Sequence, residues 1–170
     1  GKGEMLPDIT ADLEAGPAAA KSYMGKVTAL LLARFNAGAA PIAMVSMDNC
    51  SHNGDKLKAA ITTFANTWAE KGLVSAEFAA YISSDKVSFP WSMIDKITPS
   101  PDLTVGAILE EDGLHGFAPV RNARGTVTAP FVNAEETQYL VIEDNFPNGK
   151  LPLDKGGIYY TSRETVDKVE

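Results

Sequence analysis

One short segment, residues 41–55, limits most strongly what this chain can fold into. Residues 42–47 are apolar, carry no charge and follow a proline, which predicts a strand buried on both faces of a parallel sheet. The chain then becomes polar until Asn53-Gly54, which marks the entry to a helix. Open α/β sheets bind ligands beyond the carboxyl ends of their strands, so we expect a site here, with Asn49 as its leading candidate.

Helical periodicity on both sides of this strand predicts an α/β fold. A first helix is expected to begin at Gly16-Pro17 and to end at Gly38, because proline suits the first helical position. A second helix is expected from Asn53 to Gly72, whereas residues 1–15 are acidic and expected to be irregular. The apolar positions that define the two helices are Tyr23, Val27, Leu30, Leu31 and Phe35 in the first and Leu57, Ile61, Phe64 and Trp68 in the second.

Shorter elements are predicted along the rest of the chain. Ser75 can cap a helix, Gly113 can end one, and Thr161 with Glu164 has the spacing of a capping box. The β-branched residues of two further segments favour strands, the second bounded by a Phe-Pro-Asn-Gly turn. The predicted elements are helices over 75–82, over 105–111 and from 161 onward, strands at 126–128 and 139–143, and a turn at 146–149.

Composition narrows the classes of partner and the compartment. The net charge of −7 argues against nucleic acid, because phosphates require a surface rich in Lys and Arg. No apolar run approaches the roughly 18 residues that span a bilayer, so no membrane partner is expected. Cys50 is the only cysteine and cannot form an internal disulfide, which favours a reducing, cytoplasmic location.

Several common chemistries find no support in the sequence. It contains no Gly-x-Gly-x-x-Gly after a strand and no P-loop, so no phosphate cradle is recognisable. His52 and His115 have no cysteine partners at metal-binding spacing, and no metal is expected. Cys50 could be a nucleophile close to His52, but a small residue packed at the end of a strand is the more common case.

Asn49 and Asp95 each allow a structural and a functional interpretation. Asn49 could satisfy backbone groups at a strand-to-helix turn, or its amide could donate to a substrate oxygen on which negative charge develops. Asp95 could pair with Lys96 or bind a substrate hydroxyl. If both act on one small substrate, their side chains should lie within roughly 10 Å of each other. Polar neighbours such as Asn53 are interpreted as turn and helix-start residues.

Two longer motifs resemble a known family. The first is Ser46-Met-Asp-Asn-Cys-Ser-His-Asn-Gly-Asp55, and the second is Phe89-Pro-Trp-Ser-Met-Ile-Asp-Lys-Ile-Thr-Pro99. Together they resemble the polyol-specific long-chain dehydrogenases, which include mannitol 2-dehydrogenase and fructuronate reductase, also called mannonate oxidoreductase. The similarity continues through Ala129–Glu135 and Tyr139–Asp144, so it covers most of the chain.

The resemblance implies a fold and a domain organisation. Residues 1–153 would be the second half of a Rossmann-like NAD(P)-binding domain with a mostly parallel sheet, lacking its glycine-rich loop. Residues 154–170 would begin a C-terminal helical domain. Members of the family use NAD or NADP and no metal, and they interconvert a sugar alcohol or aldonate with its ketose or ketouronate.

The resemblance also implies residue roles. Asn49 corresponds to the asparagine that helps to hold the reacting oxygen, Asp95 to the substrate-binding aspartate, and Ile94 to a position beside the nicotinamide. The family's base is a lysine, and residues 163–170 resemble the approach to it, so the glycine-rich loop and the lysine are expected in the rest of the polypeptide. Trp91 replaces an asparagine of many mannitol enzymes, which favours the fructuronate reductase branch.

The expected function is therefore part of an NAD(P)-dependent polyol or uronate oxidoreductase. The expected partners are a small polyol or uronate substrate and the remainder of the same polypeptide. A non-catalytic α/β binding or scaffold domain is the alternative, because the recognisable loop and base are missing from the sequence. A small enzyme that uses Cys50 is a third possibility and would require a base within hydrogen-bond reach.

Overall fold

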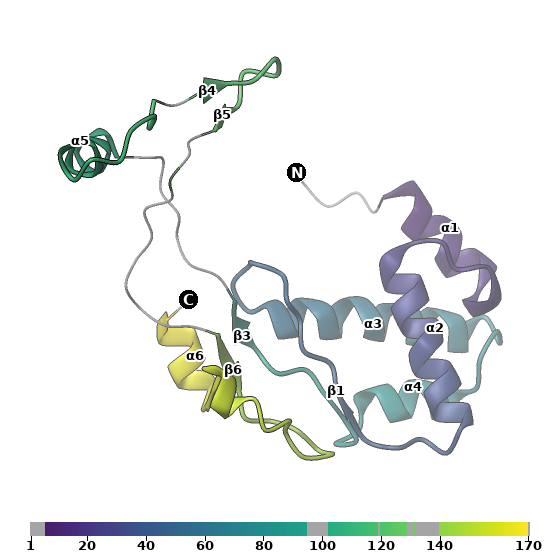
Figure 1. Cartoon of the computed structure of the whole chain (residues 1–170). Helices are drawn as coiled ribbons and strands as arrows, with labels where there is room; N and C mark the ends of the chain where they lie inside the picture. The colour runs from purple at the N-terminus through teal and green to yellow at the C-terminus, as the bar shows by residue number, and fades with distance from the viewer. Residues whose placement is uncertain (1–5, 95–101, 119, 129–130, 132–139, 170) are drawn as a thin grey trace. The chain divides into compact units, whose positions relative to one another are not determined.

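The computed structural model describes residues 6–94, 102–118, 120–128, 131 and 140–169, and the chain divides into two compact units (Figure 1). Unit 1 comprises residues 1–94 and 140–170, and unit 2 comprises residues 95–139. Asp95 therefore lies outside the described residues.

Unit 1 combines helices with short strands. Its helices are α1 (Pro7–Ala15), α2 (Tyr23–Asn36), α3 (Asn53–Glu70), α4 (Ala76–Ser83) and α6 (Arg163–Val169), with 3₁₀ turns η1 (Pro17–Ala19) and η2 (Asp154–Gly156). Its strands are β1 (Ile42–Ala43), β2 (Val87–Ser88), β3 (Ser92–Met93), β6 (Val141–Glu143) and β7 (Tyr159–Thr161).

The strands form two small sheets. β1 pairs in parallel with β2, with Ile42 opposite Val87. The second sheet has the order β3-β6-β7, in which β3 is antiparallel to β6 and β6 is parallel to β7. This mixed α/β arrangement with parallel strands confirms the predicted fold class.

Helix α3 organises the core because its apolar stripe serves two clusters. Ile61 packs with residues of α2, α4 and β2, whereas Phe64 and Trp68 pack with Leu13 of α1. All four of these side chains are buried, and the Trp68 indole N–H also donates to the Asp12 carbonyl at 3.0 Å. The predicted second helix and its buried face are confirmed, although Leu57 is only partly buried.

The N-terminal region differs from expectation. Residues 7–15 form α1 and are not irregular, because Pro7 occupies the first turn and Leu13 is buried against α3. The next helix begins at Tyr23 rather than at Pro17, since the Asp12 carboxylate accepts the N–H groups of Lys21 and Ser22 and stops the chain from continuing η1 as an α-helix.

Two details of the predicted apolar faces are also wrong. Tyr23 and Leu30 of α2 are 84% and 71% exposed, because α2 turns the face with Thr28 and Leu31 towards the core. The strand predicted over residues 42–47 is paired only at Ile42–Ala43 and is half-buried rather than buried on both faces. Its single described neighbour is β2, and Met47 is 57% exposed.

The later elements mostly agree with expectation. Ser75 caps α4 through the Phe78 N–H, β6 lies within the predicted strand, and Gly149 closes the turn after Phe146. The last helix begins as expected, but Ser162 rather than Thr161 caps it, with its hydroxyl accepting the Thr165 N–H at 3.3 Å. β7 was not predicted.

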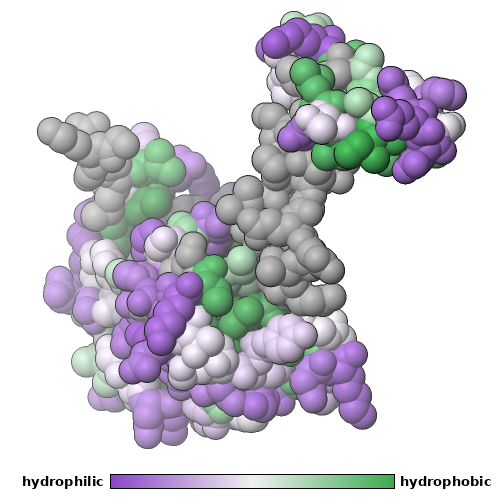
Figure 2. Space-filling view, turned by 90° about the vertical axis from the view of Figure 1, so that its left-hand side faces the viewer, coloured by the Kyte–Doolittle hydropathy of each residue, from purple (hydrophilic) through white to green (hydrophobic). Residues whose placement is uncertain are grey.

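Unit 2 contains one helix and one hairpin within its described residues. Helix α5 (Leu103–Glu111) is capped by Asp102, and β4 (Val120–Arg121) pairs with β5 (Val127–Thr128) in an antiparallel hairpin. This confirms the helix predicted over 105–111 and the strand predicted at 126–128. Figure 2 shows apolar side chains gathered on this unit; the exposed ones include Leu103, Ile108 and Leu114.

Candidate active site

Two adjacent parallel strands lead into the two motif segments. β1 is followed by residues 44–52, which we call the Asn49 loop, and β2 is followed by residues 89–94. The last bond between the strands runs from the Met44 N–H to the Ser88 carbonyl at 2.8 Å. The candidate residues thus follow the carboxyl ends of neighbouring parallel strands, where open α/β sheets bind their ligands.

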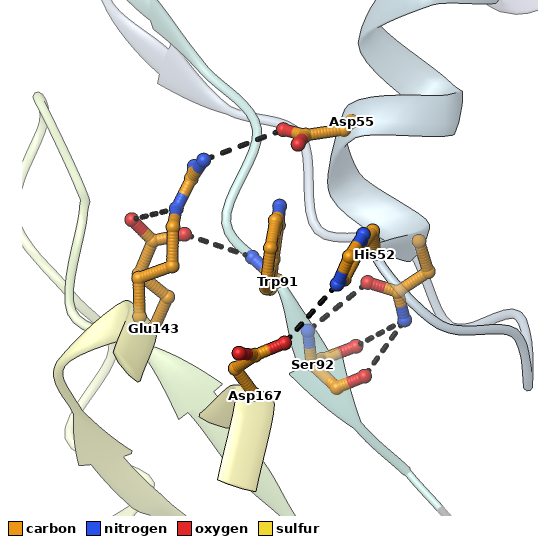
Figure 3. Close-up of polar contacts among 8 residues, drawn as sticks. His52, Asp55, Trp91, Ser92, Glu143 and Asp167 are labelled. Carbon is orange, nitrogen blue, oxygen red and sulfur yellow. Dashed lines mark hydrogen bonds and ion pairs between the residues drawn. The ribbon is translucent and has the colours of Figure 1, made fainter. Parts of the chain in front are cut away.

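A buried asparagine joins the two segments. The Asn53 amide donates to the Asp48 carbonyl at 3.0 Å and to the Ser92 carbonyl at 2.7 Å, and its oxygen accepts the Ser92 N–H at 3.1 Å. Figure 3 draws the bonds made by Ser92. Asn53 and Ser92 are 1% and 3% exposed, so the two bonds between them are made away from water. The sequence interpretation placed Asn53 only at a helix start, because nothing local indicates a partner 39 positions away.

The Asn49 loop presents its polar side chains at the surface. Asn49 is exposed in a bend, six residues beyond β1, and Cys50 is partly buried. The Cys50 thiol lies 3.8 Å from a carboxylate oxygen of Asp48, and His52 Nε2 lies 3.1 Å from Asp167 Oδ1. Both residues of the possible Cys/His pair are therefore engaged with carboxylates.

The second segment ends at Ile94, which is half-buried and directly follows β3. The Asn53–Ser92 bonds hold the start of β3 against the Asn49 loop, so the structure brings Asn49 and Ile94 onto segments that are tied together. Asp95 is outside the described residues, and its expected distance from Asn49 stays a prediction.

The Trp91 ring contacts His52, which Figure 3 shows beside it, and it also contacts Arg163. The Trp91 ring stacks on the His52 ring, with centroids 4.2 Å apart and an interplanar angle of 19°. In a second contact, the Arg163 guanidinium lies 4.7 Å from the centroid of the Trp91 ring. Trp91 is 7% exposed, and its indole N–H has no hydrogen-bond partner among the described residues. Trp91 is therefore a packed aromatic side chain.

Glu143 of β6 connects this ring to α6. One oxygen accepts the Trp91 backbone N–H at 3.0 Å and the other accepts Arg163 Nε at 3.0 Å. Arg163 also reaches Asp55 at 3.4 Å. The bond to Glu143 is the largest cause of a raised pKa at Arg163, so the guanidinium is charged throughout the working range of pH. None of these pairings was predicted, because they join residues 20 or more positions apart.

The two candidate segments carry one polar and one apolar candidate residue among the described residues. Asn49 is an exposed residue of the loop after β1, and Ile94 is a half-buried apolar residue directly after β3. The start of α3 does not offer a phosphate site: a Cβ at Gly54 would lie 2.4 Å from the Phe89 carbonyl oxygen, so other backbone covers it. Phosphate binding would have to come from elsewhere in the protein.

The described ranges contain neither a cluster of metal-binding side chains nor a helix that could span a membrane. No group of three or more His, Cys, Asp or Glu side chains in them is arranged to hold a metal ion. No helix within them is both long enough and apolar enough to cross a bilayer.

Comparison with known proteins decides the family. The model of the mannitol dehydrogenase Rossmann domain matches residues 7–155. The chain belongs to the mannitol dehydrogenase family. This confirms the resemblance drawn from the motifs and the Rossmann-like α/β class.

The relatives of this mannitol dehydrogenase family member include proteins named as an oxidoreductase and as a dehydrogenase. It is 45% identical over 170 residues to the D-mannonate oxidoreductase of Thermotoga maritima, covering 99% of this chain and 31% of the relative. It is 33% identical over 155 residues to the mannitol 2-dehydrogenase of Cereibacter sphaeroides, covering 91% and 28%. The chain thus spans less than a third of the length of these relatives.

Solved structures of polyol dehydrogenases also resemble this chain. The mannitol 2-dehydrogenase of Pseudomonas fluorescens, determined with NAD and D-mannitol, matches with a TM-score of 0.59 and 30% identity. A substrate-free D-sorbitol dehydrogenase matches with a TM-score of 0.61 and 26% identity. Each match covers 94% of this chain and 29% of the solved chain.

Proposed function

We propose that this chain is part of an NAD(P)-dependent oxidoreductase that interconverts a sugar alcohol or aldonate with its ketose or ketouronate. Mannonate and fructuronate are the favoured pair. The observation that carries this choice is the 45% identity to a D-mannonate oxidoreductase over 99% of the chain, against 33% to a mannitol 2-dehydrogenase. The relatives matched are named as oxidoreductases, which gives the scaffold alternative no support.

In this proposal the Asn49 loop addresses the reacting oxygen. The exposed Asn49 amide would donate to that oxygen, and Asp95 would bind a substrate hydroxyl. Ile94 would pack beside the nicotinamide, which when bound exchanges the hydride with the substrate carbon. The family resemblance assigns the proton transfer to a lysine elsewhere in the polypeptide.

The proposed domain organisation follows the same family pattern. Residues 1–153 would belong to the Rossmann-like domain and residues 154–170 to the beginning of the helical domain. The family-model match that ends at residue 155 supports this division. A cytoplasmic location is proposed because Cys50 is the only cysteine.

The test uses the full-length protein, meaning a polypeptide of the relatives' length that contains this chain. The reduction of fructuronate and of fructose would be measured as the loss of NADH absorbance. The same assay would then be repeated with NADPH. We expect the higher kcat/KM with fructuronate. Turnover of neither sugar with either cofactor would refute the proposed function, whereas a preference for fructose would move the chain to the mannitol branch.

A further inference from the structure

The Trp91 cluster, consisting of His52, Trp91, Glu143 and Arg163, joins three parts of unit 1 (Figure 3). His52 belongs to the Asn49 loop, Trp91 precedes β3, and Arg163 begins α6. The cluster therefore lies where the two candidate segments meet a helix that contributes no candidate catalytic residue of its own.

Helix α6 reaches the indole through two side chains, Arg163 directly and Asp167 through His52. Arg163 and Asp167 are four residues apart and so lie on one side of the helix. Arg163 contacts the Trp91 ring, and Asp167 contacts His52, which stacks on that same ring. A displacement of α6 would consequently move the contacts of both candidate segments at once.

The chemistry of the cluster suits positioning better than simple burial. The Arg163 side chain is 43% exposed, and ion pairs with an exposed partner usually contribute little to stability, so this pair is weak evidence for a role in stability. Glu143 is 8% exposed, and its two oxygens accept from the Trp91 backbone and from Arg163 in fixed directions. Directional bonds of this kind set the position of residues 91–94 more narrowly than apolar packing does.

We propose that Arg163 is a positioning residue of the substrate site, acting through Glu143 and Trp91 to set residues 91–94 against the Asn49 loop. The inference rests on the proposed function. Ile94 is the last residue of the positioned segment, and the candidate substrate residue Asp95 follows it in the sequence. Ile94 would touch only the nicotinamide, and the start of α3 offers no phosphate site, so most of the cofactor's affinity would come from elsewhere in the protein. The cluster thus bears on sugar binding more than on cofactor affinity.

The kinetic experiment compares Arg163→Met and Arg163→Lys in the full-length protein. Arg163→Met should raise the KM for fructuronate by about tenfold and the KM for NADH by less than about twofold, because misplacement of a binding group acts on its own ligand. Arg163→Lys keeps the charge but not the planar fork, and should recover only part of the loss. Lys71→Met is the matched control, since it breaks the exposed Lys71–Glu14 ion pair at the other end of α3.

Hydrogen exchange provides a second readout that does not depend on turnover. Arg163→Met should speed exchange in the peptide 89–94, where the Trp91 N–H is bonded to Glu143, by about tenfold, and Lys71→Met should leave it unchanged.

The outcomes separate the two proposals. Unchanged exchange at 89–94 in Arg163→Met would overturn the positioning role whatever the activity, and so would a lowered melting temperature with the fructuronate KM unaltered. An equal rise in both KM values would also overturn it. A wild-type protein that turns over neither sugar would instead refute the proposed function.

Discussion

Asn49 and Asn53 show how one residue type takes two different tasks four positions apart. Asn53 is buried and uses its amide to join the Asn49 loop to β3. Asn49 is exposed on the loop that Asn53 holds, where its amide can meet a ligand. The first residue fixes geometry and the second is the candidate for chemistry.

This division predicts that two alanine substitutions in the full-length protein have different effects, one on catalysis and the other on stability. Asn49→Ala should lower kcat by about 10²-fold, because a preorganised donor to the reacting oxygen is lost, without abolishing cofactor binding. Asn53→Ala should lower the free energy of unfolding by about 1–3 kcal/mol, because the buried N–H and carbonyl of Ser92 lose their partner. Steady-state kinetics and urea denaturation measure the two effects; unchanged turnover of Asn49→Ala would leave Asn49 with only a structural role.

Asp12 predicts a pH dependence of stability. The Ser22 side chain, followed by the backbone N–H groups of Lys21 and Ser22, holds the pKa of Asp12 below its ordinary 3.8. A lowered pKa in the folded state stabilises the fold above the ordinary pKa, and this contribution is lost as the pH falls through the folded value. The difference in unfolding free energy between the wild type and Asp12→Asn should therefore shrink below about pH 4, measured by urea denaturation at several pH values. A constant difference would contradict this.

Among the elements, α3 and α4 were predictable because local rules suffice for them. α3 has a regular apolar stripe and α4 has a serine cap and an apolar face. α1 was missed because its single buried apolar residue, Leu13, gives no periodicity, and the start of α2 was misplaced because the stop signal is the Asp12 carboxylate.

The candidate site divides in the same way. The polar loop after β1 and the segment ending at Ile94 were recognised from motifs, since each is continuous in the sequence. The Trp91 cluster and the hydrogen bonds of Asn53 to Ser92 were not, because their partners lie between 20 and 72 positions apart in the sequence. Long-range pairing of side chains leaves no local pattern to read.

Gly54 predicts a destabilising substitution at the start of α3. A Cβ there would lie 2.4 Å from the Phe89 carbonyl oxygen and 2.7 Å from that of Pro90, and both are backbone atoms. Gly54→Ala should cost about 1–3 kcal/mol despite the better helix propensity of alanine. Gly106→Ala in α5 is the control, since its Cβ would meet only Phe131 at 3.8 Å, and it should gain up to about 1 kcal/mol. Thermal unfolding would compare the melting temperatures of the two variants. Equal shifts in melting temperature would contradict the close approach of the Phe89 and Pro90 carbonyls to Gly54.

For the whole molecule, we predict that residues 1–170 alone show no dehydrogenase activity and at most weak NADH binding. The sequence has no recognisable glycine-rich phosphate loop, and the start of α3 is covered by backbone. Calorimetric titration with NADH and an absorbance assay with fructuronate and fructose would test this. Micromolar binding or measurable turnover would show that the cofactor site lies within these residues.

The pairing of Met93 with Val141 has a consequence for folding entropy. These two residues lie side by side in antiparallel strands, so the pair closes a loop that contains all of unit 2. Closing a loop costs free energy that grows with the logarithm of its length. Replacing residues 95–139 by a short Gly/Ser linker should therefore stabilise unit 1 by about 2 kcal/mol in urea denaturation, and a loss of stability would show that unit 2 supports the fold. On this reasoning the insertion of unit 2 lowers the stability of unit 1. The benefit of unit 2 must therefore lie in its contribution to the complete protein.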